Sequence, residues 1–131
     1  MTADAKQQLV ALARRAGVLP ALERARFLRA LVASAADNRA FRAENPGFSP
    51  PPLWWMHDMY AHASYRTYWR TGKETAAALR ALIDPLLPEG NPRIADWGCG
   101  LGRVLRHLPA RYRVTGFDVN AEAVAWCAAN L

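Results

Sequence analysis

The spacing of apolar residues predicts helices through the first 72 positions of this chain and no convincing strand among them. A first helix is expected to begin after Asp4, which suits an N-cap, and to end at Gly17. A second helix is expected to start at Pro20, because proline is favoured in the first turn of a helix. Apolar residues at helical spacing predict the inner side of this second helix: Leu22, Phe27, Leu28, Leu31 and Val32.

A linker and an aromatic segment follow these helices. The stretch NPGFSPPP at 45–52 is expected to be a loop or an extended linker, because proline disfavours helix in the residue before it. Residues 53–72 are rich in aromatics and include His57 and His62, whose spacing is poor for two metal ligands on one helical face. We therefore expect the aromatics to pack this segment onto the part of the chain that follows. A further amphipathic helix is expected from residue 73 to about Pro85.

The pattern changes at residue 93, where short strands begin to alternate with helices. The expected elements are a strand RIADW at 93–97, a glycine turn running into a helix at 98–108, a strand YRVTGFD at 112–118, and a helix at 120–131 with Asn120 as N-cap. Strands that alternate with helices through short connections are typical of the βαβ unit of a parallel sheet. The sequence therefore predicts an α/β fold in which two strands end at the same edge.

Composition narrows the class of protein. Apolar residues make up 52% of the chain and charged residues 21%, as in ordinary globular domains. No apolar run approaches the ~20 residues needed to span a bilayer, and the start lacks the layout of a secretory signal. Cys99 and Cys127 form neither a disulfide framework nor a metal-ligand spacing, so we expect a cytoplasmic protein with no metal and no membrane association. The net charge of +6 comes from scattered arginines, which favours solvated helix faces over a nucleic-acid surface.

Three glycines in five positions, Gly98, Gly100 and Gly102, follow the first strand. Glycine allows a sharp turn and lets the backbone approach a ligand with no Cβ in the way. The N-terminus of the following helix would suit a carboxylate or a phosphate. Asp118 ends the second strand, where a carboxylate can accept hydrogen bonds from both hydroxyls of a ribose. The pattern predicts a nucleoside-bearing ligand across the two strand ends; the alternative is a tight loop with Asp118 capping the next helix.

The spacing of these glycines distinguishes between the possible classes of nucleotide ligand. In a dinucleotide fingerprint the third glycine would fall at Arg103, and no P-loop G-K-[ST] follows. Asp96 precedes Gly98 by two residues, where it would repel a pyrophosphate and attract an ammonium group. The stretch DWGCGLGR, together with the acid in GFDVN, resembles the class I S-adenosylmethionine-dependent methyltransferases. Their first motif is acid-x-Gly-x-Gly-x-Gly at the end of strand one, and their second is an acid that ends strand two.

The resemblance covers residues 73–131 and implies that they are the first βαβα part of a Rossmann-like sheet, with residues 1–72 as a helical N-terminal cap. It also implies a set of residues that bind S-adenosyl-L-methionine. These are Asp96 at the amino group, the backbone of Gly98, Cys99, Gly100 and Gly102 at the methionine part, Asp118 at the ribose, and Val119 near the adenine. In the manner of similar enzymes, Tyr68 and Gly72 would lie near the cofactor carboxylate.

The reaction implied is transfer of a methyl group from a sulfonium to a small-molecule acceptor, helped by alignment and exclusion of water. No residue stands out as a general base, and the acceptor and the oligomeric state stay open. The family's domain has more strands than the two found here, so we expect an N-terminal portion of a longer protein that is inactive and binds the cofactor weakly by itself. The alternatives are an oxidoreductase with a nucleotide cofactor, which would prefer NADH to S-adenosylhomocysteine, and a non-catalytic helical interaction module in residues 1–72, with salt-dependent retention on nucleic acid.

Overall fold

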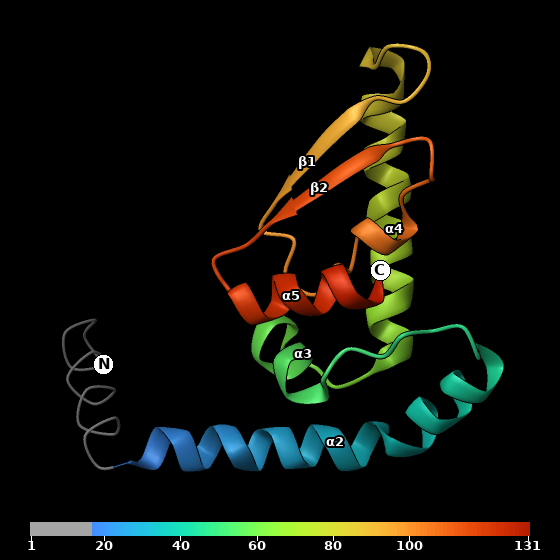
Figure 1. Ribbon diagram of the computed structural model, residues 1–131. Coiled ribbons are helices and arrows are strands. Elements are labelled where there is room, and N and C mark those ends of the chain that lie inside the picture. Colours follow the sequence, from blue (N-terminus) through green and yellow to red (C-terminus); the bar gives the residue numbers. More distant parts are fainter. Residues whose placement is uncertain (1–16) are drawn as a thin grey trace, which may run out of the picture.

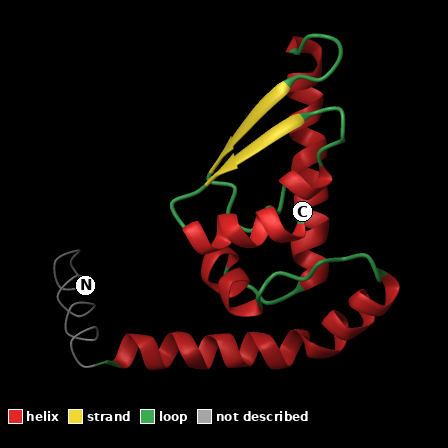
Figure 2. Ribbon diagram, in the orientation of Figure 1, coloured by secondary structure: helices red, strands yellow, loops and turns green. Residues whose placement is uncertain are grey.

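The computed structural model describes residues 17–131, so the helix expected between Asp4 and Gly17 lies outside the described residues. The described chain is mostly helical and contains one pair of short strands (Figures 1 and 2). In chain order the elements are α2 (Val18–Glu44), α3 (Leu53–Tyr60), α4 (Tyr65–Ile83), the 3-10 turn η1 (Asp84–Leu86), β1 (Arg93–Trp97), the 3-10 turn η2 (Leu105–His107), β2 (Arg113–Phe117) and α5 (Ala121–Asn130).

The long helix α2 has Pro20 in its first turn, as predicted. The prediction of which residues form its inner side is only partly correct. Phe27 and Leu31 are half-buried, whereas three of the five expected inner residues are exposed: Leu22, Leu28 and Val32. The physical reason is visible in Figure 1, where the N-terminal half of α2 extends past the rest of the described chain and has little to pack against. Among residues 17–131, no helix combines the length and the apolar character needed to cross a bilayer.

The two predicted strands form a parallel pair. Ile94 lies opposite Val114 and Trp97 lies opposite Phe117, so both strands end at the same edge, as expected. Alternate residues differ in burial along each strand, which leaves one face of the pair exposed and the other half-buried. Both strands run toward α5, and their ends lie close to its first turn (Figure 1).

The expected Rossmann-like βαβα sheet is wrong, because the crossover between the strands contains no α-helix. The chain from Gly98 to Val104 forms turns, and only the three residues of η2 are helical, in 3-10 geometry. Gly100 and Gly102 have left-handed backbone conformations, so a right-handed helix cannot begin before residue 103. Pro109 then disfavours helical geometry in the residue before it, so too few residues remain for an α-helix. The result is a mostly helical small α/β fold with two parallel strands in an open sheet.

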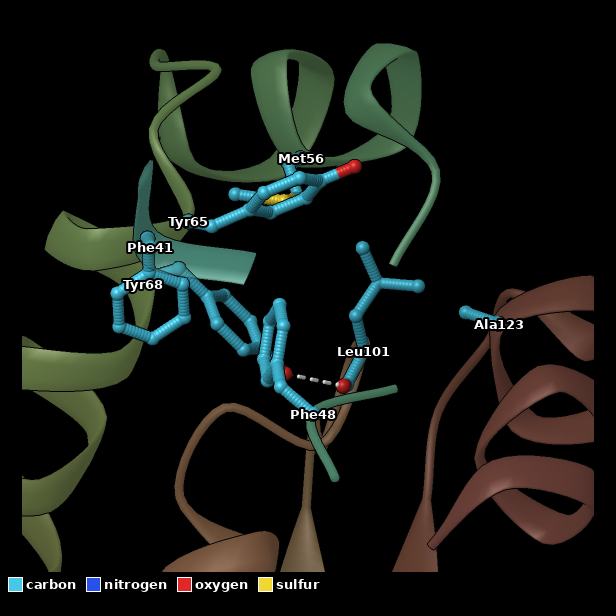
Figure 3. Close-up of a cluster of buried hydrophobic side chains, with 7 residues drawn as sticks. All are labelled: Phe41, Phe48, Met56, Tyr65, Tyr68, Leu101 and Ala123. Carbon is cyan, nitrogen blue, oxygen red and sulfur yellow. Dashed lines mark hydrogen bonds between the residues drawn. The ribbon is translucent and has the colours of Figure 1, made fainter. Parts of the chain in front are cut away.

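The hydrophobic core lies among the helices and the glycine loop rather than under the sheet. Its buried members come from α2, the 45–52 segment, α3, α4, the loop after β1, and α5 (Figure 3): Phe41, Phe48, Met56, Tyr65, Tyr68, Leu101 and Ala123. Leu101 is fully buried among these aromatic rings. The prediction that the aromatics of residues 53–72 pack onto the following part of the chain is therefore confirmed. Helix α4 runs without a break from Tyr65 to Ile83.

Candidate functional site

The glycine loop, residues 98–102, is tied at its start to the end of the neighbouring strand. The N–H groups of Gly98 and Cys99 both donate to the carbonyl oxygen of Phe117, at 2.7 and 3.0 Å. Gly98, Gly100 and Gly102 have φ values of +82°, +51° and +70°. These angles lie in the left-handed region, which residues with a Cβ rarely adopt. The sharp turn expected from the sequence is therefore present at the edge where β1 and β2 end.

The three glycines serve different purposes. A Cβ added at Gly98 would meet no atom within 4 Å, so the backbone there is open to a ligand. A Cβ at Gly100 would lie 2.9 Å from the hydroxyl of Tyr60, and one at Gly102 would collide with the side chain of Leu131 and lie 3.2 Å from Sγ of Cys127. Gly100 and Gly102 are therefore required by packing inside the protein, and only Gly98 keeps free space beside it.

The carboxylate of Asp118 joins the end of β2 to the glycine loop. Its Oδ2 accepts the N–H of Gly100 at 2.8 Å, and its Oδ1 accepts the N–H of Asn120 at 2.9 Å. The cap of α5 is Asn120, whose side chain accepts the N–H of Ala123 at 3.1 Å. A carboxylate offers about four lone-pair sites, so two of them stay available at Asp118 for hydroxyl groups of a ligand.

Asp96 lies on the half-buried face of β1, one residue before its end. Burial raises the pKa of the Asp96 carboxyl above its ordinary value, and the charge of Asp118 raises it further. The two acids therefore repel each other weakly across the strand ends. A positively charged group bound between them would relieve this repulsion, which agrees with the ammonium partner expected from the sequence.

We expect Asp96→Asn to raise the thermal midpoint of the protein at pH 7. A carboxyl whose pKa is higher in the folded than in the unfolded state favours folding at low pH and disfavours it as the pH rises through the folded pKa. The amide of Asp96→Asn does not ionise, so it removes this dependence of stability on pH. The gain in thermal midpoint should therefore be present at pH 7 and shrink at about pH 3, below the ordinary pKa of an aspartate carboxyl. Thermal melts at both pH values test this, and a gain of equal size at both would contradict it.

A cavity of about 460 Å³ opens at the strand ends beside Gly98. Its lining includes Trp97, Gly98, Phe117, Asp118, Val119 and Val124. The rings of Trp97 and Phe117 stack with centroids 6.1 Å apart and planes inclined by 28°. The Trp97 side chain is 86% exposed and Val119 is fully exposed, so the cavity has an apolar and accessible wall. Neither Trp97 nor Phe117 is among the predicted site residues, although each is the aromatic residue that ends its strand, directly before Gly98 or Asp118.

Two tyrosines hold the peptide groups on either side of Leu101. The hydroxyl of Tyr60, at the end of α3, accepts the N–H of Leu101 at 3.2 Å. The hydroxyl of Tyr68, on α4, donates to the carbonyl of Leu101 at 2.6 Å, drawn as the dashed line in Figure 3. Tyr68 is fully buried, and burial strongly raises the pKa of its phenol, so the hydroxyl keeps its proton. Tyr68 therefore supports the loop from behind and does not face the cavity.

Gly72 has a comparable supporting role. It lies in the middle of α4, where a Cβ would collide with the backbone carbonyl of Arg103. The glycine lets the helix approach the crossover between the strands closely enough for this contact. Neither Gly72 nor Tyr68 reaches the open side of the loop, so the expectation that they touch a cofactor carboxylate finds no support in their positions.

Cys99, within the glycine loop, and Cys127, on α5, are both buried free thiols. Burial raises the pKa of Cys99, and it raises the pKa of Cys127 to about 11, with a smaller contribution from Cys99. Cys127 Sγ donates weakly to the carbonyl of Gly100 at 3.4 Å. Since a thiolate is the reactive form, these protonated side chains serve packing rather than nucleophilic chemistry. Cys99 would thus contribute its backbone, as the sequence predicts.

The two histidines of the aromatic segment are engaged in packing. Nδ1 of His62 accepts the N–H of Ser64 at 3.3 Å, and the ring of His57 packs against Phe27 with centroids 5.5 Å apart. Within residues 17–131 there is no group of three or more His, Cys, Asp or Glu side chains arranged to hold a metal ion.

With the strand-end geometry in view, we compared the chain with known proteins. Comparisons with protein-family models, with curated proteins and with solved structures found no match.

Proposed function

We propose that this chain binds S-adenosyl-L-methionine across the ends of β1 and β2 and takes part in methyl transfer to a small-molecule acceptor. The observation that carries the proposal is the hydrogen bond from the N–H of Gly100 to Oδ2 of Asp118, at 2.8 Å. It unites the glycine motif and the second acid, 18 residues apart, at one edge of a parallel strand pair. Ligands of parallel sheets bind beyond the carboxyl ends of the strands.

The residues at this edge fit the chemical groups of that ligand. Gly98 leaves room for close approach to the backbone, and Asp118 keeps lone pairs for the two hydroxyls of a ribose. Trp97, Phe117 and Val119 offer apolar surface of the kind on which a flat base packs. Burial, and to a smaller extent the charge of Asp118, raise the pKa of Asp96, and an ammonium group would relieve the repulsion between the two acids.

In the proposed reaction, the role of the chain is to orient the bound ligand. S-adenosyl-L-methionine supplies a methyl group on a sulfonium sulfur. The glycine loop and Asp118 would hold the ligand by two separate groups, which limits its rotation before the acceptor attacks the methyl carbon and the thioether leaves. We assign no general base. The two free thiols favour a reducing compartment, and we propose the cytoplasm.

An NMR titration with S-adenosylhomocysteine tests the proposal, because it detects weak as well as tight binding. The amide resonances of Gly98, Cys99 and Val119 are expected to shift and to saturate. A parallel titration with NADH serves as the comparison, since a nicotinamide cofactor would place a pyrophosphate beside Asp96. Stronger shifts with NADH, or no shift at the strand ends with either ligand, would contradict the proposal.

Gly98→Val is expected to weaken binding of S-adenosylhomocysteine by at least about tenfold, a free energy of ~1.4 kcal/mol. The valine side chain would occupy the open space beside Gly98 that a ligand needs. Gly90→Val is the matched control, because Gly90 also has a positive φ, of +96°, and open surroundings. Both variants bear the cost of a strained backbone, but only Gly98→Val should lose affinity in the NMR titration. Equal affinities for the two variants would show that the loop does not contact the ligand.

A further inference from the structure

A second cavity, of about 500 Å³, lies apart from the strand ends. It is bounded by the C-terminal half of α2, the turn at residues 45–48, and the first residues of α3 and α4. Its apolar wall includes Leu31, Ala35, Phe48 and Leu53. The volume is within the range of small-molecule sites in proteins. No residue of β1, the glycine loop or β2 lines this cavity, so it is independent of the function proposed above.

The charged side chains that line this cavity are all positive. Arg39 and Arg42 line it, and none of its lining residues is acidic. Within residues 17–131 neither arginine forms a salt bridge, although acids are present on the same helix. Asp37 and Glu44 instead pair with Arg66 of α4, at 2.7 and 3.0 Å. The two guanidinium groups at the cavity are therefore available to an external anion.

The hydroxyl of Tyr65 provides a second, independent observation. The side chain of Tyr65 lines the cavity and is 8% exposed. In the described part of the chain its hydroxyl has no hydrogen-bond partner, whereas its backbone N–H donates to Oδ1 of Asn38 at 2.8 Å. In Figure 3 this hydroxyl points away from Tyr68 and Leu101. This hydroxyl is therefore free to donate to a ligand within the cavity.

The neighbouring amide of Asn38, in contrast, is engaged within the fold. The Asn38 side chain is fully engaged, since Nδ2 donates to the carbonyl of Ala63 at 2.7 Å and Oδ1 accepts the N–H of Tyr65. Asn38 therefore joins α2 to the start of α4 and belongs to the architecture. Arg42 lies close enough to Tyr65 for its charge to lower the phenol pKa, against the larger effect of burial, which raises it. A guanidinium and a free hydroxyl thus line the same cavity.

We propose that this cavity binds a small organic acid, with its carboxylate held by Arg42 and the Tyr65 hydroxyl and its apolar body against Leu31, Ala35 and Leu53. A guanidinium fork matches a carboxylate in geometry and charge, and a phenol can donate to the same group. Arg39, beside Arg42, adds positive charge that attracts the anion. The apolar wall selects an acid that has a hydrocarbon body over an inorganic anion.

Calorimetric titration of the full chain with octanoate tests the proposal. Octanol has the same body without the charge, and inorganic phosphate has charge without the body; neither is expected to bind measurably. Arg42→Gln should weaken octanoate binding about tenfold or more, the loss of a charged contact. Arg24→Gln is the matched control, since Arg24 lies on the same helix outside the cavity and its loss changes the net charge equally.

The variant Tyr65→Phe distinguishes a role of the Tyr65 hydroxyl in octanoate binding from a role in folding. It keeps the buried ring and removes only the hydroxyl, so octanoate affinity should fall several-fold while the thermal midpoint stays unchanged. A lower midpoint with unchanged octanoate affinity would overturn the proposal, because the hydroxyl would then serve the fold. Equal binding of octanol and octanoate, measurable binding of phosphate, or equal affinities for Arg42→Gln and Arg24→Gln would also overturn it.

Discussion

Gly72→Ala is expected to lower the free energy of unfolding by about 1–3 kcal/mol, the usual cost of overpacking a well-packed interior. In an unobstructed helix the same change stabilises by roughly 1 kcal/mol, because alanine is the better helix former. Here the new Cβ would collide with the carbonyl oxygen of Arg103 and lie 3.0 Å from Cδ2 of His107. The carbonyl belongs to the backbone of the crossover between the strands, so it can move only if the crossover shifts. Urea denaturation followed by circular dichroism measures the effect.

Gly47→Ala is the matched control for this substitution. A Cβ at Gly47 would meet no atom within 4 Å, and its backbone is not in the left-handed region. We expect the control to change stability by less than about 0.5 kcal/mol, as for an ordinary surface position. If Gly72→Ala were as stable as the control, or more stable, the close contact between α4 and the crossover would be wrong.

Asp118→Ala is expected to weaken binding of S-adenosylhomocysteine by about 1.5–3 kcal/mol, roughly 10- to 150-fold. The substitution removes the lone pairs proposed to accept the ribose hydroxyls. It also leaves the N–H of Gly100 and the N–H of Asn120 without their acceptor, so the loop loses one of its ties to the end of β2. Both losses act in the same direction on affinity, which the NMR titration measures.

Two further variants identify the cause of that loss. Asp118→Asn keeps one side-chain oxygen as an acceptor for a backbone N–H, so its affinity should fall between those of the wild type and Asp118→Ala. Glu122→Ala removes an exposed acid from the first turn of α5 and controls for charge near the site. Unchanged affinity in Asp118→Ala, or an equal loss in Glu122→Ala, would remove Asp118 from the binding site.

Local sequence signals were sufficient to predict the strands and the helix cap of the C-terminal part of the chain. The strands expected at 93–97 and 112–118 correspond to Arg93–Trp97 and Arg113–Phe117. Asn120 was expected as an N-cap, and its side chain does accept the N–H of Ala123. Strand residues flanked by turn residues, and a cap next to an alanine-rich stretch, depend on neighbours a few positions away. Such features can be predicted from the sequence because no distant contact is needed to produce them.

The helix expected after the glycine loop shows where local patterns mislead. Val104, Leu105 and Leu108 have helical spacing, yet only Leu105–His107 form a turn of 3-10 helix. Short helices depend on tertiary packing for most of their stability. The backbone carbonyl of Arg103 instead packs against Gly72 of α4, and Arg106 lies over the rings of Phe48 and Tyr68, with 5.0 Å between the guanidinium carbon and each ring centroid.

The sequence by itself determined the two parallel strands, the glycine turn between them and the acid at the end of the second strand. Only the tertiary structure decided that Gly98 is open while Gly100 is packed against Tyr60. Likewise, only the fold revealed that Tyr68, chosen from the sequence as a ligand contact, holds the carbonyl of Leu101, 33 positions away. Local periodicity reports the conformation of neighbours along the chain, whereas these roles depend on which distant side chains occupy the space beside each residue.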